Sequence, residues 1–566
     1  MADRIVRGLL AALLAIGTIA WARGREGHGL PTADLHADAP YYYVYLPSLL
    51  HGDLDFTDEY RETKNWYHLG LAPTGRPANA FGIGPAVLDA PLFLVGHAAA
   101  LATGSRDDGF STWEIRLYTW SSLAWSLAAV VVAYRLARRR LGGGALALAG
   151  PLACALAGPV VYYAVRQPGY AHPMATFFAA LLVDRWDASY DSPRTWKTWL
   201  VLGAVLGAGA LARPQLALWG VVLAGAAIDD LRARRSWRVV LPWLAGAAAA
   251  VVVFAPQLVA WRVVYGDWWV VPQGPGFMRW DAPCWSEVLF SSRNGLLPWA
   301  PAYAVFAVAL VALARAHRRL VGFVVAGVAL QTLANGAVWD WWGGGSFGGR
   351  RFDSTYVAFA LGAAGLVAWI ARAVPPAVRR AASWRVRARG VAAALVAAIV
   401  LDLIVVNLWL AGKTTTTNAR ITGGEPAPAI LGRLPGGSLA AAMSALSNLP
   451  ARAAFAWRHD TSLDAYDRVV GVHVLGETYP GLNSFADQRT ATLPAPALAG
   501  GRAHVLIGLN RAGGLDVTLD TDATTIEWNG TRVPPHFHTD DLRRGTNDLV
   551  LAGATHAGPI HLAATN

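Results

Sequence analysis

The sequence contains few charged residues and very few cysteines. Only 15% of its 566 residues are Asp, Glu, Lys or Arg, whereas 54% are hydrophobic and the mean hydropathy is +0.34. Soluble globular domains rarely combine such apolarity with so little charge, so the composition predicts a polytopic membrane protein. Its two cysteines, Cys154 and Cys284, are too few for a disulfide framework or a tetrahedral cysteine zinc site.

The excess of basic residues does not indicate a nucleic-acid partner. Lys and Arg number 48 against 37 Asp and Glu, which gives a net charge of +11. The basic residues lie in short clusters between apolar segments, a pattern that is typical of residues setting the orientation of a membrane protein. We therefore expect membrane lipids, and no nucleic acid, among its partners.

The apolar segments predict a helical bundle with about eleven membrane spans. Apolar stretches of suitable length lie near residues 5–22, 80–103, 114–134, 144–165, 172–186, 198–212, 214–231, 238–261, 297–315, 319–338, 355–373 and 390–410. Arg4 and Arg7 place the N-terminus in the cytoplasm. The later basic clusters should lie on the same side; they are Arg135–Arg140, Arg232–Arg238, Arg315–Arg319 and Arg379–Arg389.

The stretch 80–103 is the exception among these segments. If it crossed the membrane, all four later basic clusters would lie outside, so we predict that it dips into the outer face or lies on it. One large outer loop then runs from about residue 23 to 112. Inside the last span, Asp402 and Asn407 are expected to make hydrogen bonds between helices.

The first apolar stretch has a second interpretation. A basic start, an apolar core of about fifteen residues and Ala20-Trp21-Ala22 are also typical of a cleavable secretion signal. Under either interpretation the chain from residue 23 onward emerges on the outer face.

The chain changes character after the last span. Residues 1–411 form the predicted membrane domain, 412–470 a polar, irregular linker and 471–566 a small β-sandwich, both outside the membrane. Short alternating strands are predicted at 503–508 and 515–519. Asn529-Gly530 between 525–528 and 531–533 is a strong hairpin signal.

Two short motifs do not support the activities they suggest. Gly412-Lys413-Thr414 is similar to the end of a phosphate-binding loop, but Asn407 replaces the required first glycine and the segment leaves a membrane helix. Gly344–Gly348 has the spacing of a nucleophile elbow around Ser346, yet it connects two membrane helices and lacks a hydrolase sheet. Neither ATP binding nor serine hydrolysis is predicted.

Two carboxylates of the first outer loop are candidate catalytic groups. Asp34 and Asp38 follow the first span directly, and Tyr41 and Tyr42 come just after them. A carboxylate near the bilayer surface can act as a general base for an acceptor hydroxyl or amine. The alternative is an acidic helix cap on a surface loop, and the sequence leaves both interpretations open.

Basic residues of membrane proteins favour the cytoplasmic side, which we call the orientation rule. Arginines on the outer side go against this rule and are therefore candidate ligand-binding residues. Arg350 and Arg351 lie in a loop rich in Trp and Gly, 339–353, where tandem guanidinium groups could bind phosphate in bidentate fashion. Further basic candidates on this side are Arg166, His172, Arg213 and Arg293. Together they predict an anionic ligand at the outer leaflet.

These features together resemble a known superfamily. Asp38-Ala39-Pro40-Tyr41-Tyr42 after one span, followed by Gly82-Ile83-Gly84-Pro85-Ala86 and many further spans, is similar to the GT-C membrane glycosyltransferases. Within them, the chain resembles bacterial relatives of the protein O-mannosyltransferases and of the aminoarabinose lipid A transferases. The resemblance covers about residues 1–411. Asp38 matches the catalytic aspartate of that superfamily, although Ala39 stands where many members have Glu and Asp34 lies close enough to dispute the role.

The resemblance implies a specific chemistry. The donor would be a polyprenyl-phosphate sugar, the acceptor a glycan, lipid or protein, and the anomeric configuration would be inverted with Asp38 as the base. Arg350 and Arg351, with His172 or Arg213, would hold the leaving phosphate, and Tyr41 and Tyr42 would contact the substrate. Some members bind a divalent metal near this aspartate, but no ligand cluster is evident, so we predict no metal and no cofactor.

Less specific features of the sequence bear on other functions and on the location of the protein. A transporter or flippase of lipid-linked sugars is the main alternative, because it would also place arginines and aromatic residues near the leaflet. A scaffold with a sugar-binding tail is the third, since 527–530 and 543–549 faintly resemble galactose-binding jelly rolls. The high content of Ala, Gly, Arg and Trp suggests a GC-rich bacterial genome, which places the protein in an inner membrane with the C-terminal domain in the periplasm.

Overall fold

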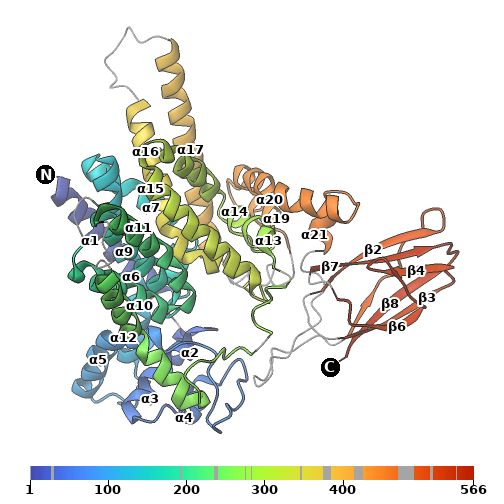
Figure 1. Ribbon diagram of the computed structural model, residues 1–566, viewed down its shortest axis with the longest axis horizontal. Coiled ribbons are helices and arrows are strands. Elements are labelled where there is room, and N and C mark those ends of the chain that lie inside the picture. Colours follow the sequence, from blue (N-terminus) through green and yellow to red (C-terminus); the bar gives the residue numbers. More distant parts are fainter. Residues whose placement is uncertain are drawn as a thin grey trace.

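The computed structural model describes residues 2–26, 31–190, 194–234, 240–274, 276–281, 283–343, 347–373, 384–413, 425–469, 490–509, 514–542 and 545–565. A large helical bundle is followed by a smaller β domain that lies to one side of it (Figure 1). The mainly α fold with a C-terminal β domain is therefore confirmed.

The bundle contains all the helices before residue 413. They are α1 Ala2–Arg23, α2 Ala39–Tyr43, α3 Tyr45–His51, α4 Thr57–Thr63, α5 Gly84–Thr103, α6 Thr112–Leu141, α7 Ala149–Leu156, α8 Val160–Val165, α9 His172–Ala188, α10 Trp196–Ala212, α11 Val221–Arg234, α12 Val240–Tyr265, α13 Trp285–Phe290, α14 Leu296–Trp299, α15 Pro301–Ala337, α16 Tyr356–Ala373 and α17 Trp384–Gly412. Short 3₁₀ turns are η1 Pro31–Asp34, η2 Gly144–Leu148, η3 Pro214–Gly220 and η5 Arg350–Thr355. Among the described residues, seven helices are long and apolar enough to cross a membrane; the count of eleven spans stays a prediction.

Helix α15 is two predicted spans joined at a sharp bend. His317 has non-helical backbone angles and divides the helix. Before the bend, Tyr303 stacks on Phe359 of α16; after it, Asn335 donates a hydrogen bond to the carbonyl of Arg351, just before α16. Both ends of α15 therefore lie at the same end of the bundle, as expected for the stretches 297–315 and 319–338.

The basic clusters that the structure describes gather at one end of the bundle, which we call the inner end. Arg139 and Arg140 pair with Asp187 at the end of α9, and Arg319 pairs with Asp229 at the end of α11. Arg138 lies 2.7 Å from Asp3 near the N-terminus. This arrangement agrees with the predicted orientation; parts of the clusters Arg232–Arg238 and Arg379–Arg389 lie outside the described residues.

Helix α5 begins and ends at the opposite end of the bundle, the outer end. A side chain at Gly84 would meet the carbonyl of Leu211 near the end of α10, and one at Gly96 would meet the start of α6 at Glu114. The loop after α5 packs Phe110 against Tyr43 of the first outer loop. Although α5 is long and apolar enough to cross, its contacts agree with the predicted segment that dips into the outer face.

The predicted stretch 144–165 is not one helix, and this expectation is corrected. It divides into η2, α7 and α8, with a break at Ala157, Gly158 and Pro159. Proline cannot continue the hydrogen-bond ladder of α7, and Gly158 packs directly against the ring of Tyr303. The side-chain amide of Asn407 donates to the carbonyls of Leu156 and Gly158, so its expected hydrogen bond between helices is confirmed.

The segment 412–470 is not irregular where the structure describes it. It contains α19 Ala427–Gly432, α20 Ser438–Arg458 and α21 Ala465–Val469. Helix α20 is rich in alanine and buries Ala440, Ser444 and Phe455 along one face. The flanking Gly and Pro residues made the segment resemble a linker, but its alanine content favours a helix that packs on the bundle.

The β domain consists of two antiparallel sheets around one hydrophobic core. Its strands are β1 Thr490–Leu493, β2 Arg502–Leu509, β3 Leu515–Thr521, β4 Thr525–Trp528, β5 Thr531–Arg532, β6 His536–Thr539, β7 Gly545–Ala552 and β8 Ala557–Ala564. The sheet orders are β1-β8-β3-β6 and β2-β7-β4-β5. Both contribute alternate residues to the core, such as Ile507, Val517 and Leu549. The predicted strands and the hairpin at Asn529-Gly530 are confirmed, with positive φ at both turn residues.

The β domain contacts the bundle through α20 and α21. Phe455 and Tyr466 pack together with Phe290 of α13 and Leu506 of β2. Beside them, buried His459 lies 3.1 Å from the carboxylate of Asp548 on β7. The domain is therefore joined to the bundle by both apolar and polar contacts.

Candidate active site at the outer end

Asp38 lies just before α2 and does not cap this helix. Its side chain makes no capping hydrogen bond, and Pro40 occupies the first turn. The first outer loop instead folds its short helices onto the bundle, which buries Tyr41 and leaves the carboxylate of Asp38 only 11% exposed. The helix-cap interpretation of Asp38 is therefore not what the structure shows.

Two side chains from distant segments hold the carboxylate of Asp38. The hydroxyl of Tyr67 donates to Oδ1 at 2.7 Å, and Nη1 of Arg350 donates to Oδ2 at 2.9 Å. The backbone N–H of Asp38 donates to the hydroxyl of Tyr170 at 3.3 Å. The first outer loop, the loop before α9 and the turn before α16 thus meet at Asp38.

Stacked aromatic rings fix Tyr67. Its ring lies 5.0 Å from that of Tyr41, almost parallel, and its backbone N–H donates to the hydroxyl of Tyr41. Burial, followed by the negative charge of Asp38, raises the pKa of Tyr67 well above its ordinary value. The phenol therefore keeps its proton and remains a hydrogen-bond donor to Asp38.

A second cluster lies next to the first and is centred on Asp353. Its Oδ2 lies 2.6 Å from Nδ1 of His172 and 2.6 Å from Nη1 of Arg213. Asp353 and His172 are both buried. His172 and Arg213, two of the predicted phosphate-binding residues, are therefore held together by a carboxylate that the sequence analysis did not select.

Tyr42 lies between the two clusters. Burial raises its pKa, and the charges of Arg213, Asp38, Arg350 and Asp353 all act on its hydroxyl. Its ring packs edge-on against Phe81. Of the predicted residues, the structure thus brings together Asp38, Tyr41, Tyr42, Arg350, His172 and Arg213.

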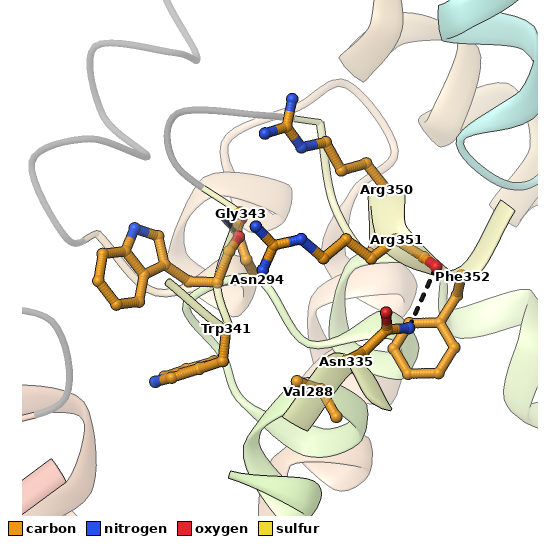
Figure 2. A pocket seen from close by; sticks show the side chains of 10 residues that line it. Val288, Asn294, Asn335, Trp341, Gly343, Arg350, Arg351 and Phe352 are labelled. Atoms are coloured by element: carbon orange, nitrogen blue, oxygen red, sulfur yellow. Dashed lines mark hydrogen bonds between the residues drawn. The ribbon is translucent and has the colours of Figure 1, made fainter. Parts of the chain in front are cut away.

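Arg350 and Arg351 do not act as one tandem pair. Arg351 donates to the carbonyl of Asp340 at 2.6 Å and to its carboxylate at 2.5 Å, so its partners differ from those of Arg350. Figure 2 shows the two guanidinium groups at separate places beside a pocket. The lining of this pocket includes Trp341, Trp342, Asn294 and Asn335. Gly344, Gly345 and Ser346 lie outside the described residues.

The remaining predicted residues have other surroundings. The guanidinium of Arg293 is buried 4.5 Å above the ring of Trp342, and burial lowers its pKa to about 10. Asp34 lies 3.7 Å from Arg116, and Arg166 lies next to Gly24. The catalytic role of Asp34 therefore stays a prediction from the sequence.

Sequence reasoning missed three residues of the site. Tyr170 follows the Gln167-Pro168-Gly169 turn, and Asp353 comes three positions after Arg350, so both lay beside selected residues. Tyr67 carried no comparable signal, because only the fold of the first loop brings it to Asp38. A search a few positions to either side of each selected residue could have suggested the first two.

The surroundings of Asp38 do not fit a divalent metal ion. Both of its carboxylate oxygens accept hydrogen bonds, and one of them faces the positive charge of Arg350. In the part of the chain that the structure describes, no three His, Cys, Asp or Glu side chains come together as ligands. We therefore derive no step through a metal, and the metal-independent reaction stays a prediction.

Part of the chain is similar in sequence to a known protein family. Residues 96–261 match the family described as dolichyl-phosphate-mannose-protein mannosyltransferase, in agreement with the predicted resemblance to the protein O-mannosyltransferases. No curated protein sequence matches the chain. The matched segment contains His172 and Arg213 but neither Asp38 nor Arg350, so the roles of these two residues depend on the structure.

Two solved structures have a similar but distant arrangement. ArnT from Cupriavidus metallidurans in the apo state is 14% identical with a TM-score of 0.41, and the similarity covers 80% of each chain. The oligosaccharyltransferase AglB from Archaeoglobus fulgidus, with an inhibitory peptide and a dolichol-phosphate, is 13% identical with a TM-score of 0.41. That similarity covers 84% of this chain and 61% of AglB.

Proposed function

We propose that this protein is a membrane glycosyltransferase that moves a sugar from a polyprenyl-phosphate donor to an acceptor at the outer face, with inversion. The observation that carries the proposal is the carboxylate of Asp38, held between Tyr67 and Arg350 at the outer end of the bundle. A base and a phosphate-binding cation in direct contact are the two groups that the reaction requires.

In the proposed reaction, Arg350 exchanges one anion for another. In the structure its guanidinium binds Asp38. When the donor enters, its phosphate competes for this guanidinium, which frees Oδ2 of Asp38 for the acceptor. Tyr67 keeps its hydrogen bond to Oδ1 and so holds the carboxylate in place during the exchange.

The chemical step balances with these groups alone. The acceptor oxygen forms a bond to the anomeric carbon while the bond from that carbon to the phosphate oxygen breaks. The acceptor proton passes to Asp38, and the electron pair of the broken bond stays on polyprenyl phosphate. Arg350 stabilises the added negative charge of this leaving group, because the charge develops next to it in a largely dry site.

The second cluster has a supporting role in the proposal. Asp353 fixes His172 and Arg213 on the far side of Tyr42. The contact with Asp353 leaves other N–H groups of Arg213 that can face the phosphate or the sugar of the lipid-linked substrate. The acceptor is a glycan, a lipid or a protein. We propose a bacterial inner membrane, with a cytoplasmic N-terminus and the outer end of the bundle facing the periplasm.

The proposal is tested by sugar transfer in liposomes. Purified protein is given a mixture of radiolabelled polyprenyl-phosphate sugars together with membrane extract as the source of acceptor. Release of unlabelled polyprenyl phosphate with label on the acceptor supports the transferase. Movement of intact donors across the bilayer without release would contradict it and favour the lipid-linked sugar transporter.

A further inference from the structure

Arg25, just after α1, is a buried cation with an unused donor. It is 5% exposed, its Nη1 donates to the carbonyl of Trp21 at 2.5 Å, and its guanidinium lies 4.7 Å above the ring of Trp21. Nη1 also donates a longer hydrogen bond, of 3.5 Å, to the carbonyl of Val165. Its buried Nε has no hydrogen-bond partner. A buried donor without a partner is costly, so this nitrogen indicates a ligand.

Two more arginines surround this position. Nε of Arg116 lies 3.7 Å from the carboxylate of Asp34, and the side chain of Arg116 is 48% exposed. Nη1 of exposed Arg166 lies 3.5 Å from the point where a side chain at Gly24 would begin. We call Arg25, Arg116, Arg166 and Asp34 the Arg25 cluster. It contains three guanidinium groups and one carboxylate, which leaves an excess of positive charge.

The charges within the Arg25 cluster repel one another. Burial lowers the pKa of Arg25 to about 10; Asp34 opposes this change, whereas Arg116 and Arg166 add to it. The single carboxylate therefore does not compensate the three cations. An additional anion between Arg25 and Arg166 would remove this repulsion and accept a hydrogen bond from the free Nε.

The Arg25 cluster lies at the level of lipid headgroups. The apolar side chains of Ile16 and Ile19 on α1 are 64% and 55% exposed, as expected for a surface facing lipid. Helix α1 has 22 residues and is about 33 Å long, enough to cross the hydrocarbon core. Arg25 comes two residues after its end, next to the outer boundary of the bilayer.

The Arg25 cluster is separate from the site around Asp38. Helix α8 lies between them: Tyr163 on this helix packs against His172, whereas Val165 faces Arg25 through its carbonyl. No hydrogen bond or ion pair described in the structure joins Arg25, Arg116 or Arg166 to Asp38 or Asp353. An anion bound at the Arg25 cluster would therefore not occupy the donor phosphate position.

We propose that the Arg25 cluster binds the phosphate group of an anionic lipid headgroup in the outer leaflet. Nε of Arg25 and the guanidinium of Arg166 donate to the phosphate oxygens. The site is independent of sugar transfer and stabilises the outer end of α1 against α6 and α8. Inorganic phosphate has the same chemistry and is the other source that the experiment distinguishes.

Native mass spectrometry of the full chain, released from nanodiscs, tests this proposal. Nanodiscs of phosphatidylcholine alone are compared with nanodiscs that also contain phosphatidylglycerol, and with the former plus inorganic phosphate. Arg166→Gln removes one exposed cation, and Arg61→Gln is the matched control in the same outer loop region, because Arg61 is also exposed and lies on α4. Arg166→Lys keeps the positive charge at this position and shows whether a substitution here disturbs folding.

The wild type and Arg61→Gln should retain phosphatidylglycerol in preference to phosphatidylcholine. Arg166→Gln should retain about fivefold less phosphatidylglycerol, the loss expected for one basic residue at a membrane surface, and Arg166→Lys should stay close to the wild type. Binding of inorganic phosphate alone, lost in Arg166→Gln, would assign the same site to free phosphate. Equal retention of both lipids, or equal behaviour of Arg166→Gln and Arg61→Gln, would overturn the proposal. Sugar transfer plays no part in this measurement, so its outcome is independent of the proposed function.

Discussion

The two ends of the helical bundle use arginine and aspartate in different ways. At the inner end, Arg139 and Arg140 at the end of α6 share Asp187 at the end of α9. At the outer end, Arg350 crosses 312 positions of sequence to reach Asp38, and a tyrosine hydroxyl completes the contact. The inner pairs join the ends of helices. The outer pair joins two loops, and its Arg350 also lines the pocket of Figure 2.

This difference teaches how to separate structural from functional ion pairs in a membrane bundle. The inner arginines follow the orientation rule and would lie there in most membrane proteins. The outer pairs go against this rule, and they connect to aromatic hydroxyls and to a histidine. Variants at matched positions of the two ends can therefore test whether the outer pairs serve the reaction.

The largest difference is expected between Arg350→Gln and Arg139→Gln. Removing the group that stabilises the leaving phosphate should lower turnover about 10²- to 10³-fold. Arg139→Gln should leave turnover per folded molecule within about twofold, because it touches only inner-end carboxylates. Both rates are measured with the same labelled donor. Similar losses in the two variants would mean that Arg350 acts only through the fold.

The carboxylates of the two ends should differ in activity but not in stability. Asp353→Asn removes a buried carboxylate bound by His172 and Arg213, and Asp187→Asn removes one shared by Arg139 and Arg140, so each should lower the free energy of unfolding by about 3 kcal/mol. Only Asp353→Asn should also raise the KM for the donor, since it releases His172 and Arg213. Thermal unfolding in detergent and steady-state kinetics measure the two effects. An unchanged KM in Asp353→Asn would contradict the role of the second cluster.

A smaller effect is expected where α5 meets the outer end. A side chain at Gly84 would lie 1.8 Å from the carbonyl of Leu211, so Gly84→Ala must displace α5 and should cost about 1 to 3 kcal/mol of stability. Gly322 in α15 has open space around it, and Gly322→Ala should stabilise the helix by up to about 1 kcal/mol. Unfolding midpoints of both variants compare the two positions. Equal midpoints would show that α5 is not packed in this way.

The smallest effect concerns the contact between α20 and the β domain. Burial raises the pKa of Asp548, but the hydrogen bonds from His459 and His504 outweigh it and hold the pKa below its ordinary value. A carboxylate whose pKa is lowered in the folded state stabilises that state fully at pH values above its unfolded pKa of about 3.9. This stabilisation is lost as the pH falls below that value. Asp548→Asn should therefore cost less than about 1 kcal/mol at neutral pH, and progressively less as the pH falls below about 3.9. The free energy of unfolding of the wild type and of Asp548→Asn is measured at neutral pH and near pH 3. A destabilisation that is larger at the acidic pH would contradict this prediction.

Much of the fold was predictable from hydropathy and charge. Apolar length located most bundle helices, and the charge rule explained why α5 returns to the outer end despite its apolar sequence. The break at Pro159 and the helix α20 were missed, because hydropathy does not report a proline break and because local Gly and Pro residues concealed an alanine-rich helix. Both errors concern local chemistry within a correctly predicted architecture.

The site was predictable as a set of candidates but not as a geometry. Asp38 and Arg350 were each selected, yet no sequence spacing indicates that they touch. Arg350 and Arg351 are neighbours in sequence, but the short turn η5 directs them to Asp38 and Asp340 respectively. Tyr67 could not be found at all, because only the fold of the first loop places its hydroxyl at the carboxylate.

The most direct test of the central claim is sugar transfer by Asp38→Asn compared with the wild type in the same liposomes. Asparagine keeps the shape of the side chain and an acceptor for Tyr67, but it cannot take up the acceptor proton. Release of polyprenyl phosphate should fall about 10²- to 10⁴-fold while the unfolding midpoint stays within a few degrees. Undiminished release by a folded Asp38→Asn variant would contradict the account, because the carboxylate at the centre of the outer end would then have no part in the reaction.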